Sequence, residues 1–312
     1  MNAERLPWIA EDPASLRLFE LAQKVAPSAA TLLITGESGS GKDYFARLIH
    51  ELSPRRDAPF LKIDCASLPQ QLVESELFGH ERGAFTGAEE RKLGRFELGG
   101  AGTIVLDEVA ALSSTTQSKL LRVLQEHSFE RLGGTETLHI KARLMALTNV
   151  DLPAAVKSGH FREDLYFRLN VLTILVPPLR QRRADIVPLA NHLFATLRSV
   201  HGRSALRLSE STIRMLIAYA WPGNVRELHN ALERAVVFSR GEMIEPADFP
   251  ANVRAATGSA AQLEGLRSLE AVERDVIAAT LEATRYQISR SADMLGISRK
   301  TLLEKRKKYG LK

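Results

Sequence analysis

Gly36-Glu-Ser-Gly-Ser-Gly-Lys42-Asp43 decides the fold of this chain, because it lies between a strand-like run and a helical pattern. Thr31-Leu-Leu-Ile-Thr35 before it is apolar, and Tyr44, Leu48 and Ile49 after it fit a helix. Such a loop lets backbone N–H groups approach a phosphate, and the helix N-terminus favours the negative charge. The stretch predicts a phosphate-binding loop in which Lys42 neutralises the β- and γ-phosphates. The alternative is an ordinary glycine-rich turn before a helix.

The end of this loop departs from the usual pattern. Asp43 stands where a Ser or Thr hydroxyl normally contacts Mg²⁺. We therefore predict ATP binding by the loop without assigning Asp43 as a metal ligand; the nucleotide-binding residues are Gly36, Glu37, Ser38, Gly39, Ser40, Gly41, Lys42 and Asp43.

Strand-like runs recur after the loop and alternate with helical patterns, which predicts a parallel α/β domain. The other strand candidates are residues 60–63, 102–106, 142–147 and 172–176. The run Thr103-Ile-Val-Leu-Asp107-Glu108 ends in two carboxylates. Two acidic residues can merely cap a strand, but the phosphate loop upstream favours a role in nucleotide chemistry.

The rest of the chain has a helical pattern with one interruption. Residues 186–249 predict a smaller all-α domain, and residues 251–266 are rich in Ala, Gly and Ser and predict a linker. We expect an α/β subdomain over 1–175, an α-helical lid over 176–250, the linker over 251–266 and a third domain over 267–312.

The third domain has helix–turn–helix spacing, with Gly296 at the turn and Leu295, Ile297 and Leu302 as a small core. Residues 299–312 carry a net charge of +6, so the remainder of the chain is close to neutral. That local charge favours a nucleic-acid backbone. Arg299, Lys300 and Thr301 are the predicted base-reading residues, and Lys305, Arg306, Lys307 and Lys308 are predicted to meet phosphates. The alternatives are a solvated terminal helix and a small packing or dimerisation domain.

Gly83-Ala84-Phe85-Thr86-Gly87-Ala88 lies between the phosphate loop and the acidic strand end. Its small residues cannot fill a core, and its glycines give Phe85 and Thr86 a flexible backbone. Alone, the string would fit a Gly/Ala surface turn. Together with the sites around it, it resembles the loop by which bacterial enhancer-binding proteins, AAA+ activators, engage the sigma-54 form of RNA polymerase.

This resemblance covers nearly the whole chain and implies an AAA+ P-loop ATPase core, a helical lid and a Fis-type DNA-binding end. By it, Asp107 holds Mg²⁺ through water, Glu108 polarises the attacking water, and Thr148-Asn149 match sensor I. Asp64 stands where many relatives carry an asparagine that pairs with the Walker B glutamate. An ionised Asp64 cannot donate a hydrogen bond to Glu108, so that switch would work differently.

The resemblance also implies assembly into a homo-hexamer, with dimers as an inactive form. Arg162 and Arg168 match the arginine-finger segment that reaches a neighbouring subunit, and Arg226 in Trp221-Pro-Gly-Asn-Val-Arg226-Glu-Leu matches sensor II. Surface ion pairs and a helix N-cap are the respective alternatives. Arg131-Leu-Gly-Gly134 resembles a supporting loop beside residues 83–88.

The resemblance implies an activator that hydrolyses ATP to remodel a closed sigma-54 promoter complex and binds enhancer DNA, and the composition fits a cytoplasmic protein. A single cysteine, Cys65, fits a reducing compartment, and no apolar run is long enough to span a membrane. A different AAA+ remodelling ATPase and a DNA-binding repressor with a vestigial ATPase remain as alternatives. The sequence has no room for an N-terminal receiver or ligand-sensing domain, so regulation is expected from expression level, a partner protein or a further segment.

Overall fold

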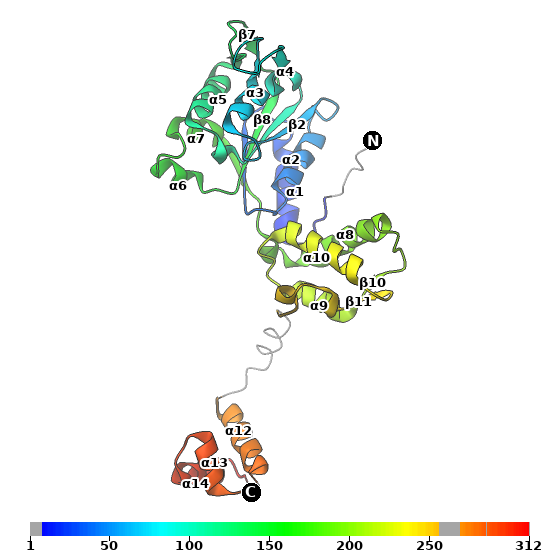
Figure 1. The fold of residues 1–312 in the computed structure, drawn as a ribbon, viewed down its shortest axis with the longest axis vertical. Helices are drawn as coiled ribbons and strands as arrows, with labels where there is room; N and C mark the ends of the chain where they lie inside the picture. Colours follow the sequence, from blue (N-terminus) through cyan, green and yellow to red (C-terminus); the bar gives the residue numbers. More distant parts are fainter. Residues whose placement is uncertain (1–7, 256–268, 285, 312) are drawn as a thin grey trace. The chain divides into compact units, whose positions relative to one another are not determined.

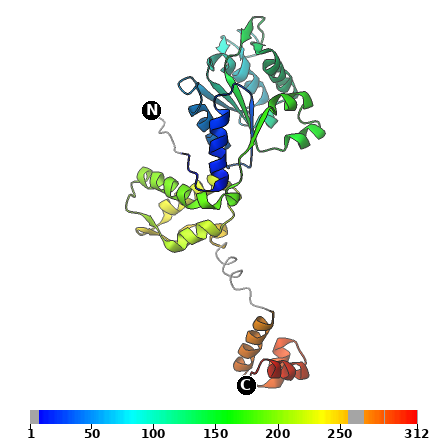
Figure 2. The ribbon, with the colours of Figure 1, turned by 180° about the vertical axis from the view of Figure 1, so that it is seen from behind.

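A computed structural model of the chain describes residues 8–255, 269–284 and 286–311. These residues form two compact units, divided between Arg254 and Ala255. The first unit contains an α/β body and a helical lid, and the second contains a small helical domain (Figures 1 and 2). Among the helices in the described ranges, none combines the length and apolarity needed to cross a bilayer.

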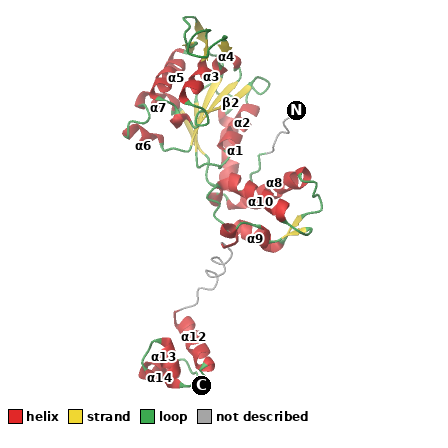
Figure 3. Ribbon diagram, in the orientation of Figure 1, coloured by secondary structure: helices red, strands yellow, loops and turns green. Residues whose placement is uncertain are grey.

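Five parallel strands form the central sheet in the order β2-β5-β8-β1-β9. Figure 3 shows the strands of the α/β body in yellow, with helices around them in red. Each predicted strand candidate becomes one of them, which confirms the predicted α/β fold. The strands are β1 (Leu32–Thr35), β2 (Phe60–Asp64), β5 (Thr103–Asp107), β8 (Arg143–Thr148) and β9 (Leu172–Leu175).

The sheet is covered by helices on both faces, as its alternating apolar side chains require. Leu32 and Ile34 pack in one cluster with residues of α1 (Pro13–Val25) and α2 (Lys42–Glu51). Leu33 belongs to the opposite cluster, with residues of α3 (Gln70–Phe78), α5 (Ser114–Glu126), α6 (Leu152–Lys157) and α7 (Glu163–Leu169). Since all five strands are parallel, the phosphate loop after β1, Asp107 at the end of β5 and Thr148 at the end of β8 meet at one edge.

Smaller elements surround residues 83–88 and 131–134. They are β3 (Gly79–His80) paired with β4 (Lys92–Leu93), β6 (Ser128–Glu130) paired with β7 (Thr137–His139), and α4 (Arg95–Leu98). In Figure 1, α3, α4 and β7 lie at the end of the α/β body opposite the lid helices. Short 3₁₀ turns complete the unit at Val109–Ala111, Leu179–Gln181, Arg183–Asp185 and Pro246–Asp248.

The lid contains α8 (Ile186–Val200), α9 (Glu210–Ala218) and α10 (Asn224–Phe238) around the buried ring of Trp221. Two features differ from the expected all-α lid and the linker that follows it. A short parallel pair, β10 (Arg207–Leu208) and β11 (Met243–Ile244), joins two lid loops. Residues 251–255 are helical, and the side chain of Val253 is buried in the lid core. Because this apolar side chain packs with the lid, the lid extends past residue 251, where the Ala-, Gly- and Ser-rich composition begins. The rest of the predicted linker lies outside the described residues.

The second unit contains α12 (Leu269–Ala283), α13 (Ile288–Leu295) and α14 (Arg299–Lys308). Ile277, Leu281, Ala292 and Leu302 form its core. Gly296 ends α13 in the left-handed region, with φ of 65°, and Ser298 caps α14 by accepting the Thr301 N–H at 3.0 Å. These features build the predicted turn between the two helices.

Candidate nucleotide site and contact surfaces

The phosphate loop presents an open cradle around Lys42. The Lys42 Nζ atom donates to the carbonyl oxygens of Gly36 at 2.9 Å and Glu37 at 3.2 Å. Burial lowers the pKa of Lys42, and the carboxylates of Glu108, Asp107 and Asp43 oppose that shift. Gly41 has φ of 97°, and a Cβ there would meet no atom within 4 Å. This free space and the adjacent ammonium fit a phosphate group.

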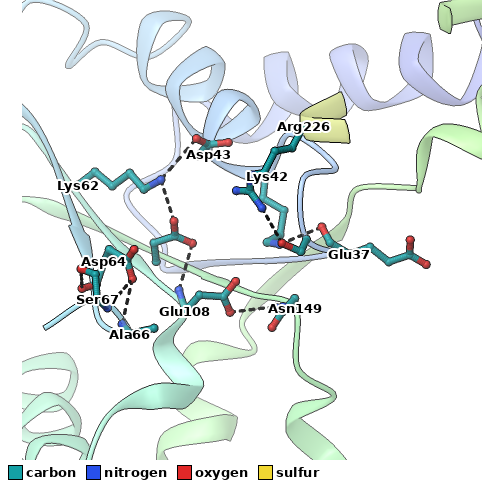
Figure 4. Close-up of polar contacts among 12 residues, drawn as sticks. Glu37, Lys42, Asp43, Lys62, Asp64, Ala66, Ser67, Glu108, Asn149 and Arg226 are labelled. Carbon is teal, nitrogen blue, oxygen red and sulfur yellow. Dashed lines mark hydrogen bonds and ion pairs between the residues drawn. The ribbon is translucent and has the colours of Figure 1, made fainter. Parts of the chain in front are cut away.

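The acidic end of β5 lies beside Asn149, which belongs to the predicted sensor I pair. Asp107 Oδ1 accepts the N–H of Glu108 at 3.1 Å, and Glu108 Oε2 accepts the N–H of Asn149 at 3.2 Å (Figure 4). Glu108 adopts a left-handed backbone with φ of 53°, which is unusual for a residue other than glycine. The contact comes from the main chain of Asn149, so its side-chain amide is not needed to hold Glu108 in this arrangement.

Asp64 contacts its own turn. Its Oδ1 atom accepts the N–H groups of Ala66 at 2.9 Å and Ser67 at 3.2 Å (Figure 4). A carboxylate can only accept such bonds. This turn supplies two N–H donors, whereas the carboxylate of Glu108 has no hydrogen to donate. Asp64 therefore caps the segment after β2 instead of pairing with Glu108.

Lys62 is a site residue that sequence analysis missed. It extends from β2 between two carboxylates, with Nζ at 2.7 Å from Asp107 Oδ2 and 3.4 Å from Asp43 Oδ2 (Figure 4). Burial favours the neutral amine, but the pairs with Asp107 and Asp43 outweigh it and raise the pKa of Lys62. The available signal was a charged residue inside the otherwise apolar run Phe60-Leu-Lys-Ile63.

The donor set suits Mg²⁺ bound together with a nucleotide. Among the described residues, no group of three or more His, Cys, Asp or Glu could hold a metal ion. Mg²⁺ commonly uses one or two carboxylates together with substrate phosphates and water. Both oxygens of Asp107 already have protein partners, Glu108 N–H and Lys62. Contact through water, as predicted, is compatible with these bonds.

The lid contacts the phosphate loop through the segment that contains Arg226. Arg226 Nη1 donates to Ser38 Oγ at 2.7 Å, and the N–H of Val225 donates to the Gly39 carbonyl at 3.0 Å. Asn224 is fully buried and donates from Nδ2 to the Ser38 carbonyl at 3.0 Å. A Cβ on Gly39 would come within 2.5 Å of the Gly223 carbonyl, so glycine is required for this approach.

Two further arginines, also missed from the sequence, join the lid to the loop. Arg180 forms a two-bond ion pair with Glu37, at 2.5 and 2.7 Å. Hydrogen bonds from Arg180 and then Asn224 lower the pKa of Glu37 to about 2. Buried Arg182 donates to the Ser40 carbonyl at 2.6 Å. These contacts couple the position of the lid to the shape of the loop.

A cavity of about 310 Å³ adjoins the phosphate loop. It lies between the N-terminal segment, α2, α8 and α10, and apolar, aromatic and histidine side chains line it together with Asp43, Arg182, Arg226 and residues 39–41 of the phosphate loop. The Nε2 atom of His192 is buried there without a hydrogen-bond partner among the described residues. The cavity has the chemistry of a nucleobase pocket: Trp8, Ile9, Tyr44, Leu189, His192, Leu193, Val225 and His229. These residues come from four distant segments, which local pattern analysis does not join.

Both predicted trans-acting arginines lie on the surface and contact α5 of their own subunit. Arg162 pairs with Asp164 at 2.7 Å and donates to Ser118 Oγ at 3.1 Å. Arg168 donates to the Leu124 carbonyl through Nε at 3.0 Å and Nη2 at 2.9 Å. Their side chains are exposed and do not contact the nucleotide-site residues of the same subunit.

Residues 83–88 form a small exposed loop. Gly83 and Gly87 have φ of 82° and 103°, and the Gly83 N–H donates to the Ala88 carbonyl at 2.8 Å. Phe85 is 41% exposed, and its ring meets that of His80 edge-on at 4.9 Å. Thr86 is exposed. The loop is closed at its base and presents its aromatic ring and hydroxyl outward.

Residues 131–134 support this loop directly. A Cβ on Gly133 would come within 2.9 Å of Ala84 Cβ, so the two loops touch. Arg131 is buried and donates to Glu97 and Glu81, each at 2.9 Å, and to Glu136 at 2.8 Å. Because Glu81 precedes the first loop and Arg131 opens the second, these ion pairs bind the two loop bases together.

The basic helix α14 has exposed side chains at its start and, further along, side chains that form ion pairs with α12. Arg299 and Lys300 are exposed at its start, as expected for base readers. Lys305 pairs with Glu273, and Lys308 lies 2.6 Å from Glu270, both on α12. The phosphate contacts predicted for Lys305 and Lys308 thus compete with ion pairs inside the domain, because α12 places its carboxylates opposite them.

The chain matches three family models along its length. The Sigma-54 interaction domain matches residues 8–175, the AAA+ ATPase lid domain residues 180–265, and the Fis family of bacterial regulatory proteins residues 268–309.

Individual proteins are similar over most of the chain. The regulatory protein AtoC of Escherichia coli is 44% identical over 311 residues, which cover 97% of this chain and 68% of AtoC. ZraR of the same organism is 43% identical, over 98% of this chain and 69% of ZraR. The crystal structure of NtrX from Brucella abortus in complex with ADP has a TM-score of 0.73 at 33% identity, and the match covers 98% of this chain and 69% of that one.

Proposed function

The chain belongs to the sigma-54-dependent transcriptional activators of the AAA+ ATPases, and we propose that it uses ATP hydrolysis to remodel sigma-54 RNA polymerase. The observation that carries this proposal is the exposed loop of residues 83–88. Its flanking elements lie at the end of the α/β body opposite the lid, while the phosphate loop contacts the lid. One end of the body thus serves the nucleotide and the other a partner.

In the proposed reaction, Lys42 and Arg226 bind the phosphates and Glu108 orients and polarises the attacking water. The Asn149 N–H holds Glu108 Oε2, so a movement of β8 reaches the carboxylate directly. Asp107 and the phosphates would hold Mg²⁺, which supplies charge neutralisation when bound. The cavity lined by Trp8, Tyr44 and His192 would take the adenine ring.

We further propose that the active form is a ring of subunits in which Arg168 reaches the nucleotide site of a neighbouring subunit. Within the part of the chain that the structure describes, the Arg168 side chain bonds only a main-chain carbonyl, so it is available to stabilise phosphoryl charge in a neighbour's site. ATPase activity per subunit should rise with protein concentration. An Arg168→Ala subunit mixed with a Lys42→Ala subunit should regain activity, because some interfaces combine an intact site with an intact arginine. Sedimentation and steady-state ATPase assays measure both effects. A strict monomer with concentration-independent turnover would contradict the ring.

The helix–turn–helix unit would bind enhancer DNA and concentrate the ATPase near the polymerase. A chain ending at Ala255 keeps Val253 in the lid core and should retain ATP hydrolysis while losing enhancer binding. Within the full chain, Arg299→Ala should alter sequence preference. Lys307→Ala should weaken binding to all sequences and reduce the salt slope by about 1. Fluorescence anisotropy over a salt series measures these effects. Undiminished enhancer affinity of the 1–255 chain would locate the DNA site elsewhere.

A further inference from the structure

The charges around the phosphate cradle balance only if Lys62 is counted. The small cavity at the loop is lined by three carboxylates and three cations: Asp43, Asp107 and Glu108, and Lys42, Lys62 and Arg226. Lys42 and Arg226 donate to acceptors on the loop itself, which are the carbonyl oxygens of Gly36 and Glu37 and the hydroxyl of Ser38. Lys62 alone of the three cations pairs with carboxylates of this set at ion-pair distance.

The carboxylate of Asp43 adds a negative charge to the site, and an additional cation balances it. At that position a P-loop ordinarily carries a neutral hydroxyl, and here it carries a carboxylate on the first turn of α2. A carboxylate repels a bound phosphate, and water around the 59% exposed side chain of Asp43 weakens this repulsion without removing it. Lys62 lies between Asp43 and Asp107 and neutralises both from a third element, β2.

We propose that Lys62 is a positioning residue that serves as the resident counter-cation of Asp43 and Asp107 and makes an acidic residue at position 43 compatible with nucleotide phosphates. It holds Asp107 Oδ2 while the Glu108 N–H holds Oδ1, so the carboxylate keeps one orientation before any metal arrives. This proposal rests on the nucleotide site of the proposed function.

The proposal predicts that Lys62 and Asp43 depend on each other. Neutralising Lys62 leaves a net negative cradle, so the affinity for ADP without Mg²⁺ should fall about ten- to a hundredfold. Mg²⁺ should restore much of that loss, because a divalent cation supplies the missing charge. Removing the Asp43 carboxylate as well should bring ADP affinity without metal back close to that of Asp43→Ser alone.

The experiment measures binding of fluorescent ADP to the full chain in EDTA and in excess Mg²⁺. The variants are Lys62→Met, Lys62→Arg, Asp43→Ser and Asp43→Ser/Lys62→Met, with Lys62→Gln as a second neutral variant should Met lower the yield of folded protein. Lys92→Ala is the matched control, because Lys92 also pairs with a carboxylate, Glu76 at 2.5 Å, away from the site. Lys62→Arg and Lys92→Ala should bind like the parent.

The outcomes separate this proposal from the one on which it rests. Parent-like ADP affinity of Lys62→Met and Lys62→Gln in EDTA overturns the counter-cation role and leaves the nucleotide site intact. A loss that Asp43→Ser does not rescue assigns Lys62 a purely structural role and also overturns it. If the parent protein binds no ADP in either buffer, the nucleotide site itself fails.

Discussion

Glu108→Gln should bind ATP about as tightly as the parent chain and hydrolyse it about 10²–10⁴-fold more slowly, the usual contribution of a positioned general base. The substitution keeps the size of the side chain and an oxygen that can still accept the Asn149 N–H. It removes the charge that polarises the attacking water. Equilibrium binding of a fluorescent ATP analogue and steady-state phosphate release measure the two effects separately.

Lys42→Ala should give the opposite division, with ATP binding weakened by about one to two orders of magnitude because a buried charge-assisted contact is lost. Glu20→Gln is a matched carboxylate control, since Glu20 is exposed on α1. Parent-like turnover in Glu108→Gln would remove the role assigned to this residue, whatever the result for Lys42→Ala.

The strands of the sheet, and the order of the site residues along the chain, could be predicted from the sequence because each strand and each motif has a local sequence pattern. Five apolar runs correspond to the five strands of the sheet. Because connections between parallel strands all return the chain in the same direction, the carboxyl ends of these strands lie at one edge of the sheet. The position of Asp107 and Glu108 at a strand end followed from this local pattern, whereas Asn149 was singled out by its match to the family's sensor I.

The contacts between elements did not follow in the same way. Lys62 is separated from Asp43 by 19 residues, and Asn224 from Ser38 by 186. No spacing rule joins residues across such distances, and the nucleobase cavity likewise combines residues near positions 8, 44, 192 and 229. Lys62 and Asp43 meet within the α/β body, because α2 packs on the sheet that contains β2. The packing of the lid on the body brings the other residues together.

The net charge of the C-terminal segment was likewise insufficient to assign individual phosphate contacts on α14. The count for residues 299–312 treated all basic side chains as available to DNA. Glu270 and Glu273 on α12 take two of them, Lys308 and Lys305, across the domain. Net charge therefore indicates α14 as the candidate DNA-binding helix, while the assignment of individual phosphate contacts also requires the carboxylates of α12.

The loop of residues 83–88 gives the largest expected effect on transcription. Thr86→Ala should retain substantial ATPase activity, because Thr86 is exposed and its loop follows α3, at the end of the α/β body opposite the lid, whereas the phosphate loop contacts the lid. The same variant should lose binding to sigma-54 in the presence of an ATP transition-state analogue, and open-complex formation should fall below detection. The physical reason is that a hydroxyl presented at a contact leaves its partner's polar group unpaired when removed.

Thr86→Ser supplies the matched comparison, since it keeps the hydroxyl and removes only a methyl group. Native gel shifts with sigma-54 and an in vitro open-complex assay on a sigma-54 promoter measure the two steps, with ATPase activity recorded on the same preparations. The loop closes through main-chain bonds from Gly83 and Ala88, and its base is fixed by Arg131, so Thr86→Ala should leave its shape unchanged. Normal activation by Thr86→Ala would mean that residues 83–88 are not the polymerase contact, and it would remove the main support for coupling ATP hydrolysis to transcription through this end of the α/β body.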